Sequence, residues 1–202
     1  MKKTLLTALA LSLLALSGCG EKSKEEHSKA YKIDEVITQI QKGEKPNAPQ
    51  TLIDDAQVMI DRAESGGYKL ITCAELKKMM EEKTPFSLLN VSPKGEYLLG
   101  LIPMAKNFEI STSSKSANGS LEWDSKAGSQ EKFAKKMGGD RERIVVIYDG
   151  GNGELYMGGR ADTACLWAKK LGFKKVYKLV GGLKSWREHN YPITQEAPSC
   201  CK

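Results

Sequence analysis

The stretch that decides the fold is residues 143–148, RIVVIY, which runs directly into Asp149-Gly150-Gly151. Its uninterrupted β-branched and aromatic residues are typical of a strand buried on both faces, because a half-exposed strand alternates apolar and polar residues. The glycines mark the point where the chain leaves that strand. The pattern therefore predicts a central strand whose carboxyl end opens into a loop.

Two further runs have the same character, residues 87–91 and 175–180, and helical patterns separate the three. Parallel strands need such crossover connections, so strands that alternate with helices indicate a mainly parallel sheet with helices on both faces. A capping box, Thr72-Cys73-Ala74-Glu75, opens one of these helices, which we expect to run to about Glu82. The main domain is thus of the α/β class and begins near Tyr68.

A helical extension is predicted ahead of this domain, over residues 31–67. Apolar residues recur at helical spacing from Ile33 to Ile40, and two prolines then interrupt the pattern over residues 42–50. A second helix is expected to begin at Thr51, with Asp54 three residues on, and to stop at Gly66-Gly67. With 202 residues, the chain holds one domain, residues 68–194, plus appendages and a tail over residues 195–202.

The first 19 residues have the layout of an export signal. Lys2 and Lys3 precede an apolar run from Leu5 to Leu16, and Leu16-Ser17-Gly18-Cys19 follows at once. This last stretch resembles the bacterial lipobox, which implies cleavage before Cys19 and acylation of that cysteine, with palmitate among the usual chains. A transmembrane helix needs about 20 apolar residues, so that alternative is disfavoured, as is a plain secretory signal with a chance cysteine.

Residues 20–30 are almost wholly charged or small, which predicts a flexible tether to a membrane. Removal of the signal takes two lysines from the 31 basic residues and leaves 29 against 25 acidic ones. So mild an excess, without a dense basic block, argues against nucleic acid as a partner. We expect a lipid-anchored protein of the cell envelope, facing the periplasm or exterior; Gly20 favours the outer membrane if the host has two.

Three segments, in this order and spacing, resemble the rhodanese-like domain family of thiosulfate sulfurtransferases and some phosphatases, over residues 68–193. The first comprises residues 71–76 and 88–92, and the second is GEYLLGLIPMAKN at 95–107. The third starts at Ile144 and includes Arg160, Leu171-Gly172-Phe173, Val176-Tyr177, Gly181-Gly182-Leu183, Trp186 and Tyr191-Pro192-Ile193. The resemblance implies the rhodanese-like fold.

The chain departs from the family pattern at the positions that carry chemistry. Asn90 and Ser92 replace an acidic and a basic residue, and Leu101 and Met104 replace a histidine and a glycine. The family has a nucleophilic cysteine at the end of the central strand, held by loop amides and the next helix. Here Asp149 stands there, and residues 149–160 contain no cysteine. We therefore expect the protein to have no catalytic residue, no cofactor and no metal site.

Asp149 itself is expected to form an ion pair with Arg160 that holds the loop, since no general base or metal motif would support an aspartyl nucleophile. The loop glycines leave room for amides to face an anion, and this candidate anion site comprises Gly150, Gly151, Gly153, Gly158, Gly159 and Arg160. A glycine-rich turn without ligand is the equal alternative. A calcium loop is disfavoured because Asp149, Asn152 and Glu154 lack its spacing.

The remaining thiols are the alternative reactive groups. Cys165 is expected to pack as a buried thiol, and Cys73 also, although its place in the first turn of a helix could lower its pKa. Cys200-Cys201 could form a vicinal disulfide, pair with another cysteine, or bind a soft metal. His27 and His189 belong to no short-range motif and are predicted at the surface.

Together these features predict a membrane-anchored module with one rhodanese-like domain and no loop nucleophile, which binds an envelope protein or a small anion. The alternative is a sulfurtransferase or thiol-redox protein that uses Cys73, Cys165, Cys200 or Cys201. A phosphatase of the same fold is disfavoured, because it too needs a thiolate in the loop.

Overall fold

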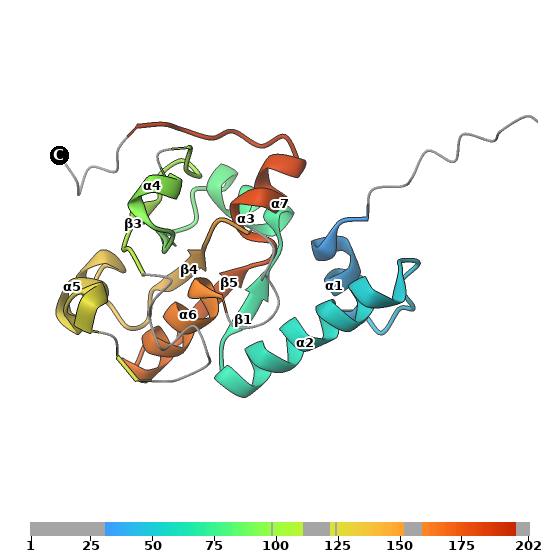
Figure 1. The fold of residues 1–202 in the computed structure, drawn as a ribbon, viewed down its shortest axis with the longest axis horizontal. Helices are drawn as coiled ribbons and strands as arrows, with labels where there is room; N and C mark the ends of the chain where they lie inside the picture. The colour runs from blue at the N-terminus through green and yellow to red at the C-terminus, as the bar shows by residue number, and fades with distance from the viewer. Residues whose placement is uncertain (1–30, 98, 111–121, 124, 152–158, 197–202) are drawn as a thin grey trace, which may run out of the picture. The chain divides into compact units, whose positions relative to one another are not determined.

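The computed structural model describes residues 31–97, 99–110, 122–123, 125–151 and 159–196 (Figure 1). The chain divides into two units, Met1–Ala30 and Tyr31–Lys202, and everything below belongs to the second. The predicted signal, Cys19, the tether and the Cys200-Cys201 pair lie outside the described residues. Among those described, no helix is long and apolar enough to cross a membrane.

A single parallel sheet forms the centre of the domain, with strand order β1-β5-β4-β2-β3 (Figure 1). The three predicted strands are confirmed within a residue at each end. The sheet also gains two short strands that the sequence pattern did not separate from their surroundings. The bounds are β1 Lys69–Ile71, β2 Phe86–Asn90, β3 Lys106–Asn107, β4 Ile144–Tyr148 and β5 Lys175–Leu179.

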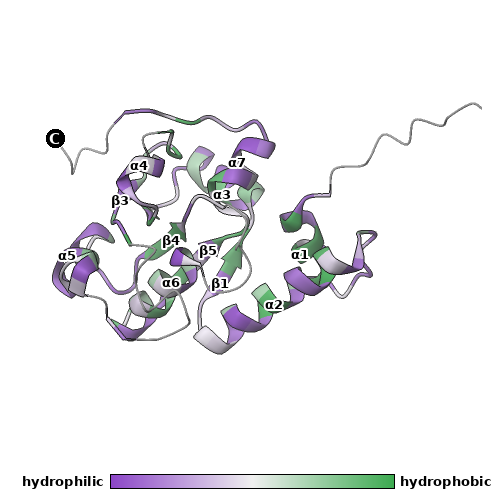
Figure 2. Ribbon diagram, in the orientation of Figure 1, coloured by the Kyte–Doolittle hydropathy of each residue, from purple (hydrophilic) through white to green (hydrophobic). Residues whose placement is uncertain are grey.

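Helices cover both faces of this sheet, as predicted for an α/β fold. One apolar cluster joins α5 and α6 to the sheet, and a second joins α3 and α7 to it. Figure 2 shows β4 and much of β1 in the hydrophobic colour, and both hydrophilic and hydrophobic residues in the surrounding helices. The helices are α3 Cys73–Glu81, α4 Lys94–Tyr97, α5 Gln130–Lys136, α6 Arg160–Lys170 and α7 Gly182–Glu188, with a 3-10 turn η2 at Ser125–Ala127.

The predicted capping box at the start of α3 is confirmed. The hydroxyl of Thr72 accepts a hydrogen bond from the Glu75 backbone N–H, and the Glu75 carboxylate accepts one from the Thr72 backbone N–H. Two otherwise unpaired donors are thereby satisfied. The cap fixes where the chain turns from β1 into α3, and so fixes Cys73 as the first residue of that helix.

The extension consists of α1 Ile33–Gln41 and α2 Gln50–Gly66. A third apolar cluster joins the two helices to Val180, at the end of β5. The helix α2 begins at Gln50, one residue before the expected Thr51, and its N-cap is Pro49, which offers no side-chain acceptor. Asp54 accepts a hydrogen bond from the Gln50 side chain. The stop at Gly66-Gly67 is confirmed, with Gly67 in the left-handed conformation.

A buried ion pair crosses the interior between β5 and α6. Lys178 Nζ lies 2.6 Å from Asp162 Oδ2, and the Tyr68 hydroxyl donates to Asp162 Oδ1 at 2.5 Å. Both charged residues are almost fully buried. Burial, and then the Asp162 carboxylate, raise the pKa of Tyr68 far above its usual range, so the phenol stays a donor. The group is a satisfied structural network, in which removal of one member would strand a buried charge.

The loops that follow β4 and β5 interlock. The backbone N–H of Leu183 donates to the Asp149 carbonyl at 2.9 Å, and that of Lys184 to the Gly150 carbonyl at 3.1 Å. The approach is so close that a Cβ on Gly151 would lie 2.1 Å from the Gly181 carbonyl oxygen. Only a chain without side chains at these positions can bring the two loops together.

Gly151→Ala therefore tests this interlock, and Gly43→Ala is its matched control. Both glycines have φ +73°, but a Cβ on Gly43 would meet nothing within 4 Å. We expect Gly43→Ala to lower the free energy of unfolding by about 1 kcal/mol, through left-handed strain alone. Gly151→Ala should cost about 3 kcal/mol or more, because the overlap also breaks the loop hydrogen bonds. Urea titration measures both; equal losses would contradict the interlock.

Candidate functional site

A pocket of about 220 Å³ lies at the carboxyl ends of β2 and β4. Its lining includes Asn90 and Ser92 from the end of β2, Gly150 after β4, and Lys184 and Arg187 from α7. In open parallel sheets, ligands bind at this edge, because the loops that follow the strands converge there. The pocket is therefore the candidate binding site.

The floor of the pocket is held by amide hydrogen bonds. Asn90 Oδ1 accepts from the Ser92 backbone N–H at 3.1 Å and from Asn107 Nδ2 at 2.8 Å. The Ser92 hydroxyl is buried and has no hydrogen-bond partner among the described residues. A buried hydroxyl without a partner is costly, so a ligand or water that reaches Ser92 would gain a hydrogen bond. In the sequence, Ser92 is distinguished only as a departure from the family pattern, and nothing there predicts a binding role for it.

The charges around the pocket are mixed. Lys184 Nζ lies 3.9 Å from Glu188 Oε1, and an Arg187 guanidinium nitrogen donates to the Leu99 carbonyl at 2.7 Å. Glu96 adds a second carboxylate to the lining. The pocket thus carries both signs of charge, which suits a ligand held by directed hydrogen bonds more than a simple polyanion.

Asp149 caps the helix that follows the loop. Its Oδ1 accepts from the Gly151 backbone N–H at 3.1 Å, and its Oδ2 accepts from the Ala161 backbone N–H at 3.0 Å, in the first turn of α6. Unpaired N–H groups and the helix dipole both favour a carboxylate at this place. The carboxylate thereby occupies amides that an external anion would otherwise use.

The predicted ion pair between Asp149 and Arg160 is wrong. Arg160 Nη1 lies 3.6 Å from Glu96 Oε1 instead. The reason is geometric: the Asp149 carboxylate is turned toward backbone donors, whereas the Arg160 side chain leaves α6 toward α4. Arg160 Nε is buried and unpartnered among the described residues. Asp149 thus caps α6, and no salt bridge joins it to another described residue.

The anion site expected from the loop glycines stays a prediction. Gly150 lines the pocket, Gly151 donates to Asp149, and Gly159 sits at the start of α6. Gly153 and Gly158 lie outside the described residues, as do Asn152 and Glu154 of the disfavoured calcium loop.

The two cysteines that the structure describes are both buried and free. Burial raises the pKa of Cys73 to about 12, so the helix start does not make it a thiolate at neutral pH. Burial, and then the nearby Asp162 carboxylate, raise the pKa of Cys165 well above its usual range. Neither thiol lines the pocket.

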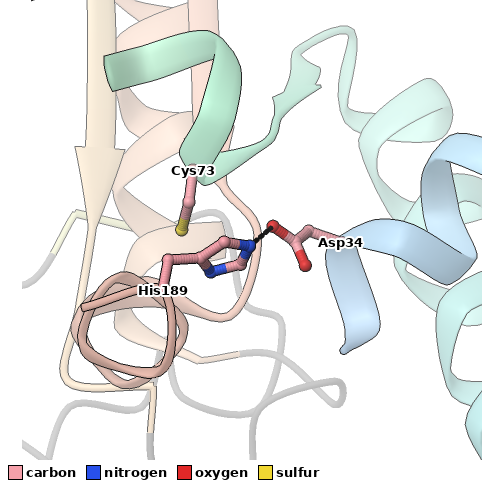
Figure 3. A group of neighbouring side chains, drawn as sticks. All are labelled: Asp34, Cys73 and His189. Atoms are coloured by element: carbon pink, nitrogen blue, oxygen red, sulfur yellow. Dashed lines mark ion pairs between the residues drawn. The ribbon is translucent and has the colours of Figure 1, made fainter. Parts of the chain in front are cut away.

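His189 is not a surface residue, contrary to the prediction. Its Nε2 lies 3.2 Å from Asp34 Oδ2, and its Nδ1 lies 2.8 Å from the Ser185 carbonyl oxygen. Figure 3 shows the imidazole between Asp34 and the Cys73 thiol. One potential ligand atom of each of these three residues lies within 4.8 Å of the others. They come from α1, the start of α3 and the end of α7, so no short-range sequence motif predicts that they meet.

Comparison with known proteins agrees with this fold. The family model "Rhodanese-like domain" matches residues 72–189, more than half of the chain. No curated protein matches the chain.

Several solved structures are similar to part of the chain. A polysulfide-sulfur transferase from Wolinella succinogenes is 22% identical, with coverage of 69% of this chain and 85% of that one, and a TM-score of 0.46. A 3-mercaptopyruvate sulfotransferase from Escherichia coli is 20% identical, with coverage of 64% and 52% and a TM-score of 0.45. A rhodanese-related protein from Thermoplasma volcanium is 19% identical, with coverage of 64% and 100% and a TM-score of 0.43.

The burial of the thiols predicts their reactivity. In a Tyr31–Lys202 protein with Cys200→Ser and Cys201→Ser, we expect Cys73 and Cys165 to resist a disulfide reagent at pH 8, because their thiolates are scarce. Both should react at once in denaturant. Quantitative thiol titration measures this, with Cys165→Ser and Cys73→Ser variants to assign each thiol. Rapid labelling of the native protein would show that a domain cysteine is accessible.

Proposed function

The chain belongs to the rhodanese-like domain family, and on that basis we propose that it is a lipid-anchored, non-catalytic member that binds an envelope protein. The binding site is the pocket at the carboxyl ends of β2 and β4. In this proposal the domain has the family's fold and uses the pocket at the carboxyl ends of β2 and β4 to recognise a partner, without sulfur transfer.

One observation carries this proposal, the role of Asp149. The residue stands directly after β4, where the resemblance expects a nucleophilic cysteine, and its carboxylate accepts hydrogen bonds from Gly151 and Ala161. A carboxylate cannot carry a sulfane sulfur. The same amides that would stabilise a thiolate or persulfide are already paired, so this place in the loop favours a structural role.

The pocket supports recognition of a protein partner. Its polar groups are spread over β2, α4 and α7, with Lys184 and Arg187 opposed by Glu96 and Glu188. Such a surface favours a peptide segment that supplies both donors and acceptors. A small anion is the competing ligand, and it would have to displace the Asp149 carboxylate or bind beside Lys184.

Cyanide-dependent thiosulfate sulfurtransferase activity tests the non-catalytic assignment. We expect the Tyr31–Lys202 protein to be inert, because Asp149 is no sulfur carrier and the domain thiols are buried. A variant with Cys73, Cys165, Cys200 and Cys201 all changed to serine is the matched control. Turnover by the unaltered protein that this variant loses would overturn the proposal and establish an unconventional cysteine as the sulfur carrier.

The membrane anchor has its own test in the full chain. We expect incorporation of labelled palmitate and recovery in the membrane fraction, because acyl chains contribute about 0.8 kcal/mol per buried methylene. Cys19→Ala should remove the label and release the protein, while Cys73→Ala keeps both. Membrane retention of an unlabelled Cys19→Ala protein would instead point to an uncleaved signal as the anchor.

A further inference from the structure

We propose that Asp34, Cys73 and His189 form a zinc site that fastens the N-terminal extension to the rhodanese-like domain. The site lies apart from the pocket and goes beyond the proposed binding function. Its three ligands offer one carboxylate oxygen, one sulfur and one imidazole nitrogen, from α1, α3 and the residue that ends α7 (Figure 3).

The distances between the three ligand atoms are close to those around a tetrahedrally coordinated zinc ion. His189 Nε2 and Asp34 Oδ2 are 3.2 Å apart, and all three ligand atoms lie within 4.8 Å of one another. Zinc bonds of about 2.0 Å to nitrogen or oxygen and about 2.3 Å to sulfur place ligand atoms about 3.3–3.5 Å apart. The cluster therefore needs a contraction on the order of 1 Å to close on the ion, within the reach of a side-chain adjustment.

The imidazole is already oriented as a metal ligand. A carbonyl oxygen only accepts, so the 2.8 Å contact with Ser185 places the proton on Nδ1. Metal-binding histidines are held in this way, with one ring N–H donated to a backbone carbonyl and the other nitrogen directed at the ion. Here that other nitrogen, Nε2, faces Asp34 and Cys73.

Charge balance also favours a divalent ion. Asp34 is 3% exposed and Cys73 is 0% exposed, so an isolated charge on either is disfavoured. On binding, two protons leave for solvent: that of the Cys73 thiol and the one shared between His189 Nε2 and the Asp34 carboxyl, which frees Nε2 to bind the ion. The sulfur and the Asp34 carboxylate then carry two negative charges. These neutralise Zn²⁺, and the buried centre has no net charge.

An independent feature beside the cluster points to an unfilled coordination sphere. The Ser185 hydroxyl is buried and makes no hydrogen bond of ordinary geometry, although it lies close enough to the Cys73 thiol to lower its pKa against the larger effect of burial. This hydroxyl therefore has no strong hydrogen-bond partner among the described residues. A fourth ligand on zinc, such as water, would give it one.

The mixed ligand set selects the metal. Calcium and magnesium require several oxygen ligands, and the cluster offers one carboxylate. Thiolate with imidazole suits Zn²⁺, and Co²⁺ replaces it in the same geometry as a coloured probe. We therefore assign Zn²⁺ to the site and use Co²⁺ to report on its sulfur ligand.

The test uses the Tyr31–Lys202 protein with Cys200→Ser and Cys201→Ser, since all three ligands lie within this unit. The reduced protein is unfolded, refolded with Zn²⁺ or Co²⁺, and freed of excess metal, so that burial does not limit entry. We expect about one ion per chain, a sulfur-to-cobalt charge-transfer band, and a higher Tm with Zn²⁺.

Three variants and one control assign the ligands. Cys73→Ser should abolish the charge-transfer band, and His189→Gln and Asp34→Asn should weaken binding by tenfold or more. Cys165→Ser removes the other buried thiol and should bind as well as the parent. A metal-free refolded parent, or a band that survives in Cys73→Ser, would overturn the site. If Cys73→Ser does not fold, the metal affinity of folded Asp34→Asn becomes the deciding measurement. An affinity equal to that of the parent would overturn the zinc site.

The zinc site and the binding function fail separately. Metal content and the cobalt band report on the cluster, whereas the sulfurtransferase assay reports on the loop at Asp149. A protein that binds no metal and is inert toward thiosulfate would therefore contradict the zinc site and leave the proposed binding function standing.

Discussion

The close approach of the loops after β4 and β5 is the constraint on which the rest of the domain depends. Glycines at 151, 181 and 182 allow backbone to touch backbone, and two hydrogen bonds from the start of α7 lock the contact. This contact holds the start of α7 against the end of β4. Both the pocket and the Asp34–Cys73–His189 cluster draw residues from α7 or its end, so both inherit their geometry from it.

The fold could be predicted from local signals because parallel strands buried on both faces have a distinctive composition. The runs at 87–91, 143–148 and 175–180 each gave a strand, and Thr72 with Glu75 gave the cap of α3. The short strands β1 and β3 could not be predicted, because two or three residues are too few to show a periodic pattern. The same limit applies to Met104, which stands where the family has a glycine and adopts a left-handed φ of 72°, a conformation that composition does not predict.

The candidate sites were predictable only where they follow a strand in the chain. Asp149 could be singled out because it directly follows β4. Its partners could not be predicted, since they are backbone N–H groups, which every residue type except proline provides. The Asp162–Lys178 pair and the His189 cluster join residues from separate elements, and each pairing depends on tertiary packing. Lys178 between apolar neighbours in β5 was the available sequence signal for the first pairing, and the second had none.

Asp149 also changes what kind of molecule can compete for the loop. A carboxylate carried on the same backbone behaves as a tethered ligand, whose effective concentration at the amides reaches the millimolar range or above. A free monovalent anion at ordinary concentration meets a competitor that never diffuses away. Under the proposed binding function, this arrangement favours a larger ligand that contacts Ser92, Lys184 and Arg187 together over a lone ion.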